Sequence, residues 1–191
     1  RENNYTKTDI FNVDIVASGI QHWVKGKISQ TSILESPPHY EFFKGRHKIR
    51  QKLRDFLVGR KPICFVGGLP GAGKTALVAC ELSQLEQQTE KRCLWTNTST
   101  RRSLSTILYD LALIGDSEGH LRLFEWLQQE ARDPKDMVEG FFSRLNEWPL
   151  VLVVDDVDEE ASPWIKWLVV AFERRSLIQK LILIARKRPQ C

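Results

Sequence analysis

Residues 68–75 read Gly68-Leu69-Pro70-Gly71-Ala72-Gly73-Lys74-Thr75, which is the pattern G-x-x-x-x-G-K-T. The apolar run 62–66 before this stretch is typical of a buried parallel strand, and residues 76–82 after it are typical of a helix. Glycines let successive backbone N–H groups turn inward around an anion, and a helix N-terminus adds the positive end of its dipole. Strand, glycine loop and helix in this order predict an α/β fold with a phosphate-binding loop.

The residues of this stretch have defined chemistry in such a loop. The backbone from Gly68 to Ala76 would hold the phosphates of a nucleotide. Lys74 can reach the β- and γ-phosphates, and the hydroxyl of Thr75 can be a ligand of Mg²⁺. The alternative is a glycine-rich turn that matches by chance. We disfavour it because all the fixed positions match and both flanks have the required character.

The composition is that of an ordinary globular protein. The 191 residues suffice for one α/β domain with an extension, and 42% of them are hydrophobic and 27% charged. No apolar run approaches the ~20 residues of a membrane helix, and the chain does not begin with a signal peptide, so we expect no membrane association. Because the first residue is Arg1 rather than methionine, we expect a piece of a longer protein.

The cysteines are scattered along the chain without C-x-x-C spacing. Two of them fall in predicted strands, where a buried thiol is ordinary. We therefore expect reduced thiols, no zinc site and a cytoplasmic location. The four residues are Cys64, Cys80, Cys93 and Cys191.

Positive charge is concentrated near the start of the chain. The net charge is +4, but residues 1–61 carry 12 Lys and Arg against 6 Asp and Glu, and the densest run is 44–54. A basic helix can contact the phosphate backbone of nucleic acid, although such a run is more often a solvated helix face. Nucleic acid is therefore an alternative partner and not the expected one.

We predict an N-terminal extension at 1–39 and a nucleotide-binding domain at 40–191. Residues 14–29 have apolar side chains at the spacing of an amphipathic helix, and Ser36-Pro37-Pro38 then marks a linker. This helix would dock on the main domain or contact another domain or subunit. Its apolar positions are Val16, Ile20, Trp23, Val24 and Ile28.

Strand and helix patterns alternate along the rest of the chain. Strands are predicted at 62–66, 92–96, 150–154 and 180–185. Helices are predicted at 46–58 with Ile49, Leu53, Phe56 and Leu57 on one face, at 76–88, at 104–115 with Gly115 as its end, at 119–131, from Pro134 to about 147 after an Asp133 cap, and from Pro163 to about 172. This alternation predicts a P-loop NTPase three-layer sandwich, a parallel central sheet with helices on both faces.

The apolar strand 150–154 runs directly into Asp155-Asp156. We place it next to the strand before the phosphate loop. Ligands of parallel sheets bind at the carboxyl ends of the strands, so both carboxylates would emerge beside that loop. Asp155 would hold Mg²⁺ through water, and Asp156 would orient or deprotonate an attacking water. Alternatively, Asp156 caps a helix or belongs to a turn.

Arg186 follows the last predicted strand and should leave the sheet at the same edge. A guanidinium at that place could contact the γ-phosphate and distinguish ATP from ADP. From the residues alone, the simpler interpretation is an exposed arginine in the basic tail Arg186-Lys187-Arg188.

In their order, these motifs resemble the nucleotide-binding module of NB-ARC proteins. The resemblance rests on Phe43-Lys44-Gly45-Arg46 before a helix, on Gly68–Thr75, on Leu150–Asp156 and on Leu181–Arg186, and it covers about residues 40–189. NB-ARC proteins belong to the STAND class of signalling ATPases, which includes plant resistance proteins and apoptosome scaffolds.

The resemblance implies a role for each motif. Arg46 and the residues before it would line the adenine side, and Asp155 would serve the metal. Asp156 would serve hydrolysis and Arg186 would sense the γ-phosphate, so that these two residues and Lys74 form the catalytic group.

The chain also departs from the family pattern. Lys44 stands where the family usually has an aliphatic residue, and His47 stands where it usually has glutamate. The acidic run 155–159 also resembles the motif of NACHT proteins, a sister group. The chain stops at Cys191, before the helical and winged-helix segments that close over ADP in this family.

The function implied is that of a molecular switch in immune or cell-death signalling. It would bind ADP at rest and ATP when active, and it would hydrolyse ATP slowly. Its expected partners are adenine nucleotide, the effector and sensor domains of the same protein, and further copies of itself on activation. The alternatives are a working AAA-like ATPase that acts on a macromolecule, a NACHT-type switch, and a nucleic-acid binder that uses the basic stretch 44–61.

Overall fold

The computed structural model describes residues 38, 40, 43–98, 104–119, 122–128, 133–145, 148–157, 162–174 and 178–187. All of them belong to the second of the two units into which the chain divides, Ile33–Cys191. The predicted helix at 14–29 lies outside the described residues, so the division into an extension and a domain stays a prediction. No helix in the described part is both long enough and apolar enough to span a bilayer.

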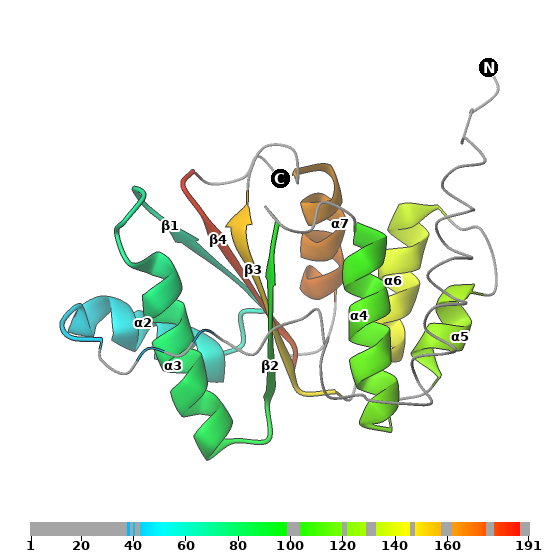
Figure 1. Ribbon diagram of the computed structural model, residues 1–191, viewed down its shortest axis with the longest axis horizontal. Coiled ribbons are helices and arrows are strands. Elements are labelled where there is room, and N and C mark those ends of the chain that lie inside the picture. The colour runs from blue at the N-terminus through cyan, green and yellow to red at the C-terminus, as the bar shows by residue number, and fades with distance from the viewer. Residues whose placement is uncertain are drawn as a thin grey trace. The chain divides into compact units, whose positions relative to one another are not determined.

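The described strands form one parallel sheet in the order β1-β4-β3-β2 (Figure 1). The two central strands are almost completely buried, as expected for apolar strands covered on both faces. The bounds are Ile63–Gly67 for β1, Arg92–Asn97 for β2, Leu150–Val157 for β3 and Lys180–Ala185 for β4. Each of the four predicted strands is therefore confirmed.

The lateral position predicted for β3 is wrong. β3 does not lie beside β1, because β4 is hydrogen-bonded to both of them and separates them. The apolar pattern of a strand indicates that both of its faces are covered. The pattern does not indicate which other strand lies beside that strand. With no charge among residues 181–185, β4 can occupy the central place.

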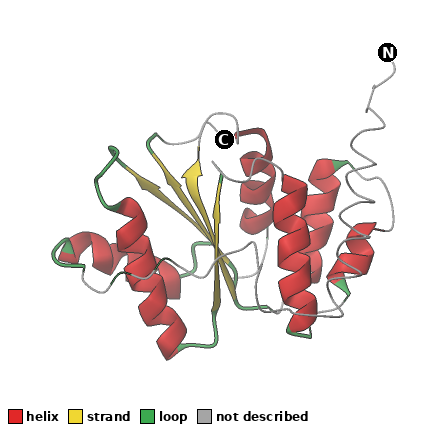
Figure 2. Cartoon of the chain, in the orientation of Figure 1, coloured by secondary structure: helices red, strands yellow, loops and turns green. Residues whose placement is uncertain are grey.

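Helices cover both faces of the sheet, which confirms the predicted three-layer α/β architecture (Figure 2). One buried cluster joins α2 and α3 to the sheet, and a larger one joins α4, α5, α6 and α7 to the opposite face. The bounds are His47–Val58 for α2, Lys74–Gln88 for α3, Leu104–Ser117 for α4, Leu123–Gln128 for α5, Pro134–Arg144 for α6 and Ser162–Glu173 for α7.

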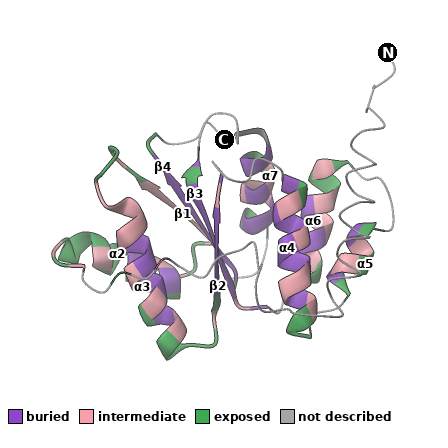
Figure 3. Ribbon diagram, in the orientation of Figure 1, coloured by how far each residue is buried: buried purple, intermediate pink, exposed green. Residues whose placement is uncertain are grey.

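Strand residues alternate between these two cores. In β3, Leu150 and Leu152 belong to the larger core, whereas Val151 and Val153 belong to the smaller one. The ribbon of β3 is accordingly coloured as buried along most of its length (Figure 3). The aromatic centre of the larger core is Phe142, whose ring centroid lies 4.8 Å from that of Phe172. Both cores are therefore continuous with β3, and they hold its carboxyl end in a defined position.

Three local predictions need correction. Gly115 does not end α4, because it is buried and the helix continues to Ser117. The next helix begins at Leu123 rather than near 119. The Asp116 carboxylate fixes this start, because it accepts hydrogen bonds from the N–H groups of the first two residues of α5. Ile49 is 49% exposed, so it does not belong to the buried face of α2. The predicted Asp133 cap of α6 is confirmed by its bond from the Lys135 N–H at 2.9 Å.

Gly140 leaves room for Trp126 between α5 and α6. A Cβ atom at Gly140 would lie 2.8 Å from the Trp126 ring, closer than real contacts allow. We expect Gly140→Ala to destabilise the protein by about 1–2 kcal/mol, measured by urea unfolding, because the indole must move.

The same substitution in a Trp126→Leu background provides the control. Without the indole, alanine should regain its helix propensity over glycine of about 1 kcal/mol, and the sign of the effect should reverse. A destabilisation of equal size in both backgrounds would contradict the steric explanation.

Candidate functional site

The phosphate loop connects β1 to α3 as predicted, and its backbone requires glycine. Gly71 and Gly73 both have φ near +72°, a left-handed conformation that residues with a Cβ atom rarely adopt, and Gly73 is the N-cap of α3. The Lys74 ammonium folds back over the loop and donates to the carbonyl oxygens of Gly68 at 2.9 Å and Leu69 at 3.1 Å. These are contacts that an anion in the loop would replace.

The threonine of the loop meets the first aspartate of the acidic pair. Asp155, 7% exposed at the end of β3, lies beside the Thr75 hydroxyl, close enough for that hydroxyl to lower the pKa of its carboxyl. The Oδ1 atom of Asp155 accepts the backbone N–H of Asp156 at 2.7 Å. Burial, assisted by the charge of Asp156, raises the pKa of the Asp155 carboxyl, although this hydrogen bond, the Thr75 hydroxyl and the Lys74 charge oppose the rise. A hydroxyl and a carboxylate from distant parts of the chain are thus brought together.

The second aspartate has an unusual backbone conformation. Asp156 is exposed with φ of +52°, and the register between β3 and β4 shifts between Val154 and Val157. Residues other than glycine rarely adopt a left-handed conformation. Those that do are often found at functional sites. In this conformation the Asp156 side chain points away from the sheet, whereas a residue with ordinary strand geometry would continue the strand.

Thr98 holds this acidic pair from the end of β2. Its hydroxyl donates to the Asp156 carbonyl at 2.5 Å, and its N–H donates to the Asp155 carbonyl at 3.1 Å. Our reading of the sequence missed Thr98. The available signal was the polar run Thr96-Asn97-Thr98 at the carboxyl end of a predicted strand, the edge at which ligands of parallel sheets bind.

Thr98→Val should lower the free energy of unfolding by about 1 kcal/mol, because the Asp156 carbonyl loses the hydroxyl that donates to it. Thr96→Val is a matched control on the same strand. The Thr96 hydroxyl is buried and has no hydrogen-bond partner in the described part of the chain, so its removal should leave stability unchanged or raise it. Urea unfolding of both variants tests this, and equal losses would contradict the assignment.

Arg186 comes directly after β4, between the phosphate loop and the acidic pair. Ala185, the last residue of β4, is paired in register with Gly67 on one side and with Val157 on the other. Arg186 therefore leaves the sheet beside Gly68, and its side chain is exposed. The insertion of β4 that our prediction missed is what gives this arginine its central place.

The segment before α2 lies against the phosphate loop. The Phe43 ring is 3.8 Å from the place of a Cβ atom on Gly73. Gly45 and Arg46 have φ of +87° and +53°, and the Arg46 carbonyl accepts the first hydrogen bonds of α2. Arg46 follows Phe43 by three residues and has an exposed side chain, and its expected role on the adenine side stays a prediction.

The family follows from a comparison with known proteins. Residues 43–183 match the model of the AAA ATPase domain, from the segment before α2 to the fourth residue of β4. The chain belongs to this family. The matched model is not that of NB-ARC proteins, so the NB-ARC assignment stays a prediction.

Two solved structures are similar to this chain, and the first of them has the same fold. One is a Signal Transduction ATPase with Numerous Domains (STAND) protein with a tetratricopeptide repeat sensor from Pyrococcus horikoshii, at 21% identity and a TM-score of 0.66, covering 86% of this chain and 23% of that one. Another is the Aeropyrum pernix ORC1 protein in complex with DNA, at 17% identity and a TM-score of 0.49, covering 73% of this chain and 37% of that one. The chain spans less than half the length of either protein. No curated protein matches the sequence.

The site of this AAA ATPase domain fits a nucleotide with Mg²⁺. Hydroxyl and carboxylate oxygens such as those of Thr75 and Asp155 are ligands that Mg²⁺ prefers. The described residues contain no group of three or more His, Cys, Asp or Glu side chains that could hold a metal by themselves. Mg²⁺ usually binds through one or two protein ligands together with phosphates and water.

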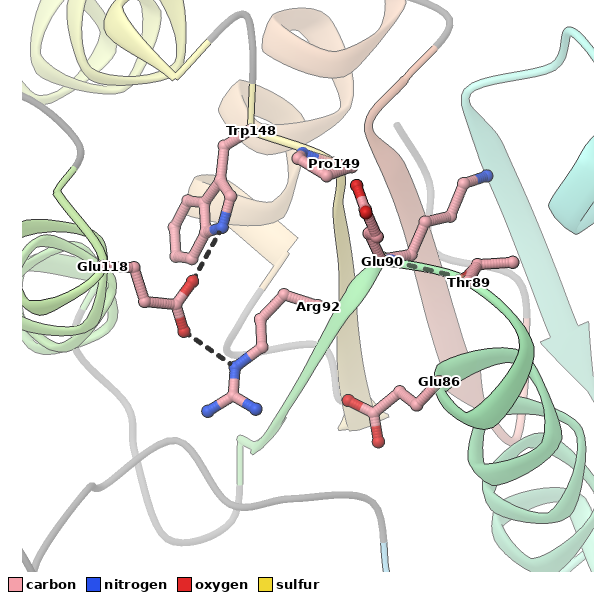
Figure 4. Close-up of a pocket in the computed structure, with 8 residues that line it drawn as sticks. Glu86, Thr89, Glu90, Arg92, Glu118, Trp148 and Pro149 are labelled. Atoms are coloured by element: carbon pink, nitrogen blue, oxygen red, sulfur yellow. Dashed lines mark hydrogen bonds and ion pairs between the residues drawn. The ribbon is translucent and has the colours of Figure 1, made fainter.

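A groove of about 500 Å³ lies at the opposite edge of the sheet and does not belong to this site (Figure 4). It opens where β2 and β3 begin. Its central polar groups satisfy one another, because Glu118 accepts from Arg92 and from the Trp148 indole, both at 3.1 Å. None of the residues that line this groove belongs to the candidate nucleotide site of the AAA ATPase domain.

Proposed function

We propose that this chain is the adenine-nucleotide-binding core of a STAND-like signalling switch. The observation that carries nucleotide binding is the meeting of Thr75 with the buried Asp155 beneath a glycine loop. In this proposal, the backbone of residues 68–76 holds the phosphates, and Lys74 neutralises them. Thr75 and Asp155 hold Mg²⁺, which would supply positive charge at the phosphates.

Two further residues would act on the γ-phosphate. Asp156 is exposed at the same edge, and it would orient or deprotonate a water. Arg186 would sense whether the γ-phosphate is present. The family match supports ATP hydrolysis as the class of reaction, and we propose that turnover is slow.

The switch would depend on the difference between ADP and ATP. Inverting a population from 1:99 to 99:1 requires about 5.5 kcal/mol of differential binding. Contacts of Lys74, Arg186 and Mg²⁺ with one phosphate are a plausible source of much of that energy. ADP would mark the resting state and ATP the active one. In the active state the protein would associate with further copies of itself, and effector and sensor domains of the same protein would link it to immune or cell-death signalling. The likeness to the Pyrococcus horikoshii STAND protein supports this proposal through the fold.

The second candidate is an AAA-like ATPase that performs work on a macromolecule. Membership in the AAA ATPase domain family favours it equally. A shorter aspartate at 156, where such enzymes usually have glutamate, speaks against strong turnover.

Nucleotide identity and turnover distinguish the two candidates. The switch predicts that the protein binds ADP tightly and, after addition of Mg²⁺ and ATP, converts little more than one equivalent over the first minutes. Sustained turnover that Asp156→Asn removes would favour the working ATPase. Failure to bind either nucleotide in calorimetry would overturn both.

A further inference from the structure

The middle of the phosphate-loop helix contains a buried carboxylate with two arginine partners. The Glu81 side chain is 1% exposed, and its Oε1 atom accepts from the Nε atom of Arg50. The Nε atom of Arg54 donates to its Oε2 atom at 2.5 Å, and an Nη atom of Arg54 donates to Oε1 at 3.2 Å. We call Arg50, Arg54 and Glu81 the α2–α3 clamp.

The clamp accounts for part of the basic run that could have indicated a nucleic-acid surface. Arg50, which is largely buried, and Arg54, which is 46% exposed, both pair with the buried Glu81 carboxylate. Burial alone would raise the pKa of Glu81, but the hydrogen bonds from Arg54 and Arg50 outweigh it, so that the pKa is lowered and the carboxyl is ionised. A buried ion pair of this kind contributes specificity of position more than net stability.

Few apolar contacts hold α2 in place. The buried residues of this twelve-residue helix are Leu53 and Leu57. Its carboxyl end is fixed by lysines, because Lys91 donates to the Leu57 carbonyl at 2.9 Å and Lys180 donates to the Gly59 carbonyl at 2.6 Å. Its position relative to α3 therefore depends on directional polar contacts as well as on this small apolar core, and the clamp joins it to α3 at Glu81.

A continuous set of contacts connects the clamp to both sides of the site. The Arg50 N–H donates to the Arg46 carbonyl at 3.0 Å, so that its position determines where the segment 43–46 enters the helix. Glu81 lies on the same rigid helix as Lys74 and Thr75, two turns further along. The clamp thereby sets the distance between the segment 43–46 and the phosphate loop.

We propose that Glu81 is a positioning residue for the nucleobase, which it places through Arg50 without touching the nucleotide. This inference rests on the proposed function, because it takes the segment 43–46 to be the adenine side. It follows that loosening the clamp weakens the contacts of the base and leaves those of the phosphates intact.

The experiment compares ATP with inorganic triphosphate, both with Mg²⁺, by calorimetry on Glu81→Gln and Arg50→Met. Each variant should bind ATP about tenfold more weakly than the parent and bind triphosphate within about twofold of it. The double variant should lose no more than either single variant, because both remove the same connection. Glu86→Gln is the matched control on α3, because the Glu86 carboxylate accepts the Cys93 N–H of β2, and it should change neither affinity.

The outcomes separate this inference from the proposed function. Equal losses for ATP and triphosphate, or no loss in either variant, would show that the clamp only supports the fold. Retained triphosphate binding shows in each case that the loop is folded, and if Glu81→Gln fails to fold, Arg50→Met decides the question because Arg54 still pairs with Glu81. A parent that binds triphosphate and ATP equally would overturn the base-side assignment, and one that binds neither would overturn the proposed function as well.

Discussion

Lys74→Ala is expected to weaken ATP binding at least about 100-fold, because a charge-assisted hydrogen bond contributes about 1.5–3 kcal/mol and this ammonium would donate more than one to the phosphates. In the structure, the Lys74 ammonium donates to the carbonyls of Gly68 and Leu69. Both belong to the surface loop, where water can take the place of the ammonium. The free energy of unfolding should therefore change by less than about 1 kcal/mol.

Calorimetric titration with ATP and with ADP measures the expected loss. The loss should be larger for ATP than for ADP if Lys74 reaches the γ-phosphate. Lys166→Ala, at an exposed position of α7, removes the same charge far from the loop and should leave both affinities unchanged. If Lys74→Ala binds ATP as the parent does, the phosphate loop is not the nucleotide site.

Asp155→Asn is expected to stabilise the nucleotide-free protein and to abolish the dependence of ATP binding on Mg²⁺. The parent carries a buried carboxylate whose pKa is raised, first by burial and then by the charge of Asp156. Its ionised form is therefore less favourable in the folded protein than in the unfolded chain. Asparagine keeps a carbonyl oxygen that can accept from the Asp156 N–H and the Thr75 hydroxyl, and it lacks the charge.

The sign of the pH dependence follows from the direction of this shift. For a carboxyl with a raised pKa, the contribution to stability is fully present below the ordinary value of 3.8 and is lost as pH rises through the raised value. The advantage of Asp155→Asn over the parent should therefore be small in acid, widen as pH rises through that window, and stay constant above it.

Thermal unfolding without nucleotide between pH 4 and 8, together with ATP titrations with and without Mg²⁺, tests both parts. Asp136→Asn, at an exposed position in the first turn of α6, removes one negative charge away from the site and should change neither result appreciably. A lower melting temperature for Asp155→Asn at neutral pH would show that its charge is compensated in the free protein. Retained Mg²⁺ dependence would exclude Asp155 as a metal ligand.

Local patterns in the sequence determined much of this protein. The phosphate loop could be predicted because its left-handed backbone requires glycine at positions 71 and 73, and because Lys74 begins the helix that follows. The last strand was predicted residue for residue, because the uninterrupted apolar run at 181–185 leaves few alternatives. Such signals arise from neighbours in the chain, and for that reason sequence alone reveals them.

The tertiary structure alone decided which of these elements meet. The insertion of β4 between β1 and β3 places Arg186 beside the phosphate loop, and no periodicity encodes that order. The partnership of Thr98 with Asp156 and that of Arg50 with Glu81 join residues far apart in the chain. The sequence pattern around a residue indicates whether its side chain is exposed or buried. Which other side chain it contacts depends on how the helices and strands pack. The chemistry of the phosphate loop could therefore be predicted from the sequence. Which residues contact the aspartates and arginines of the domain could not.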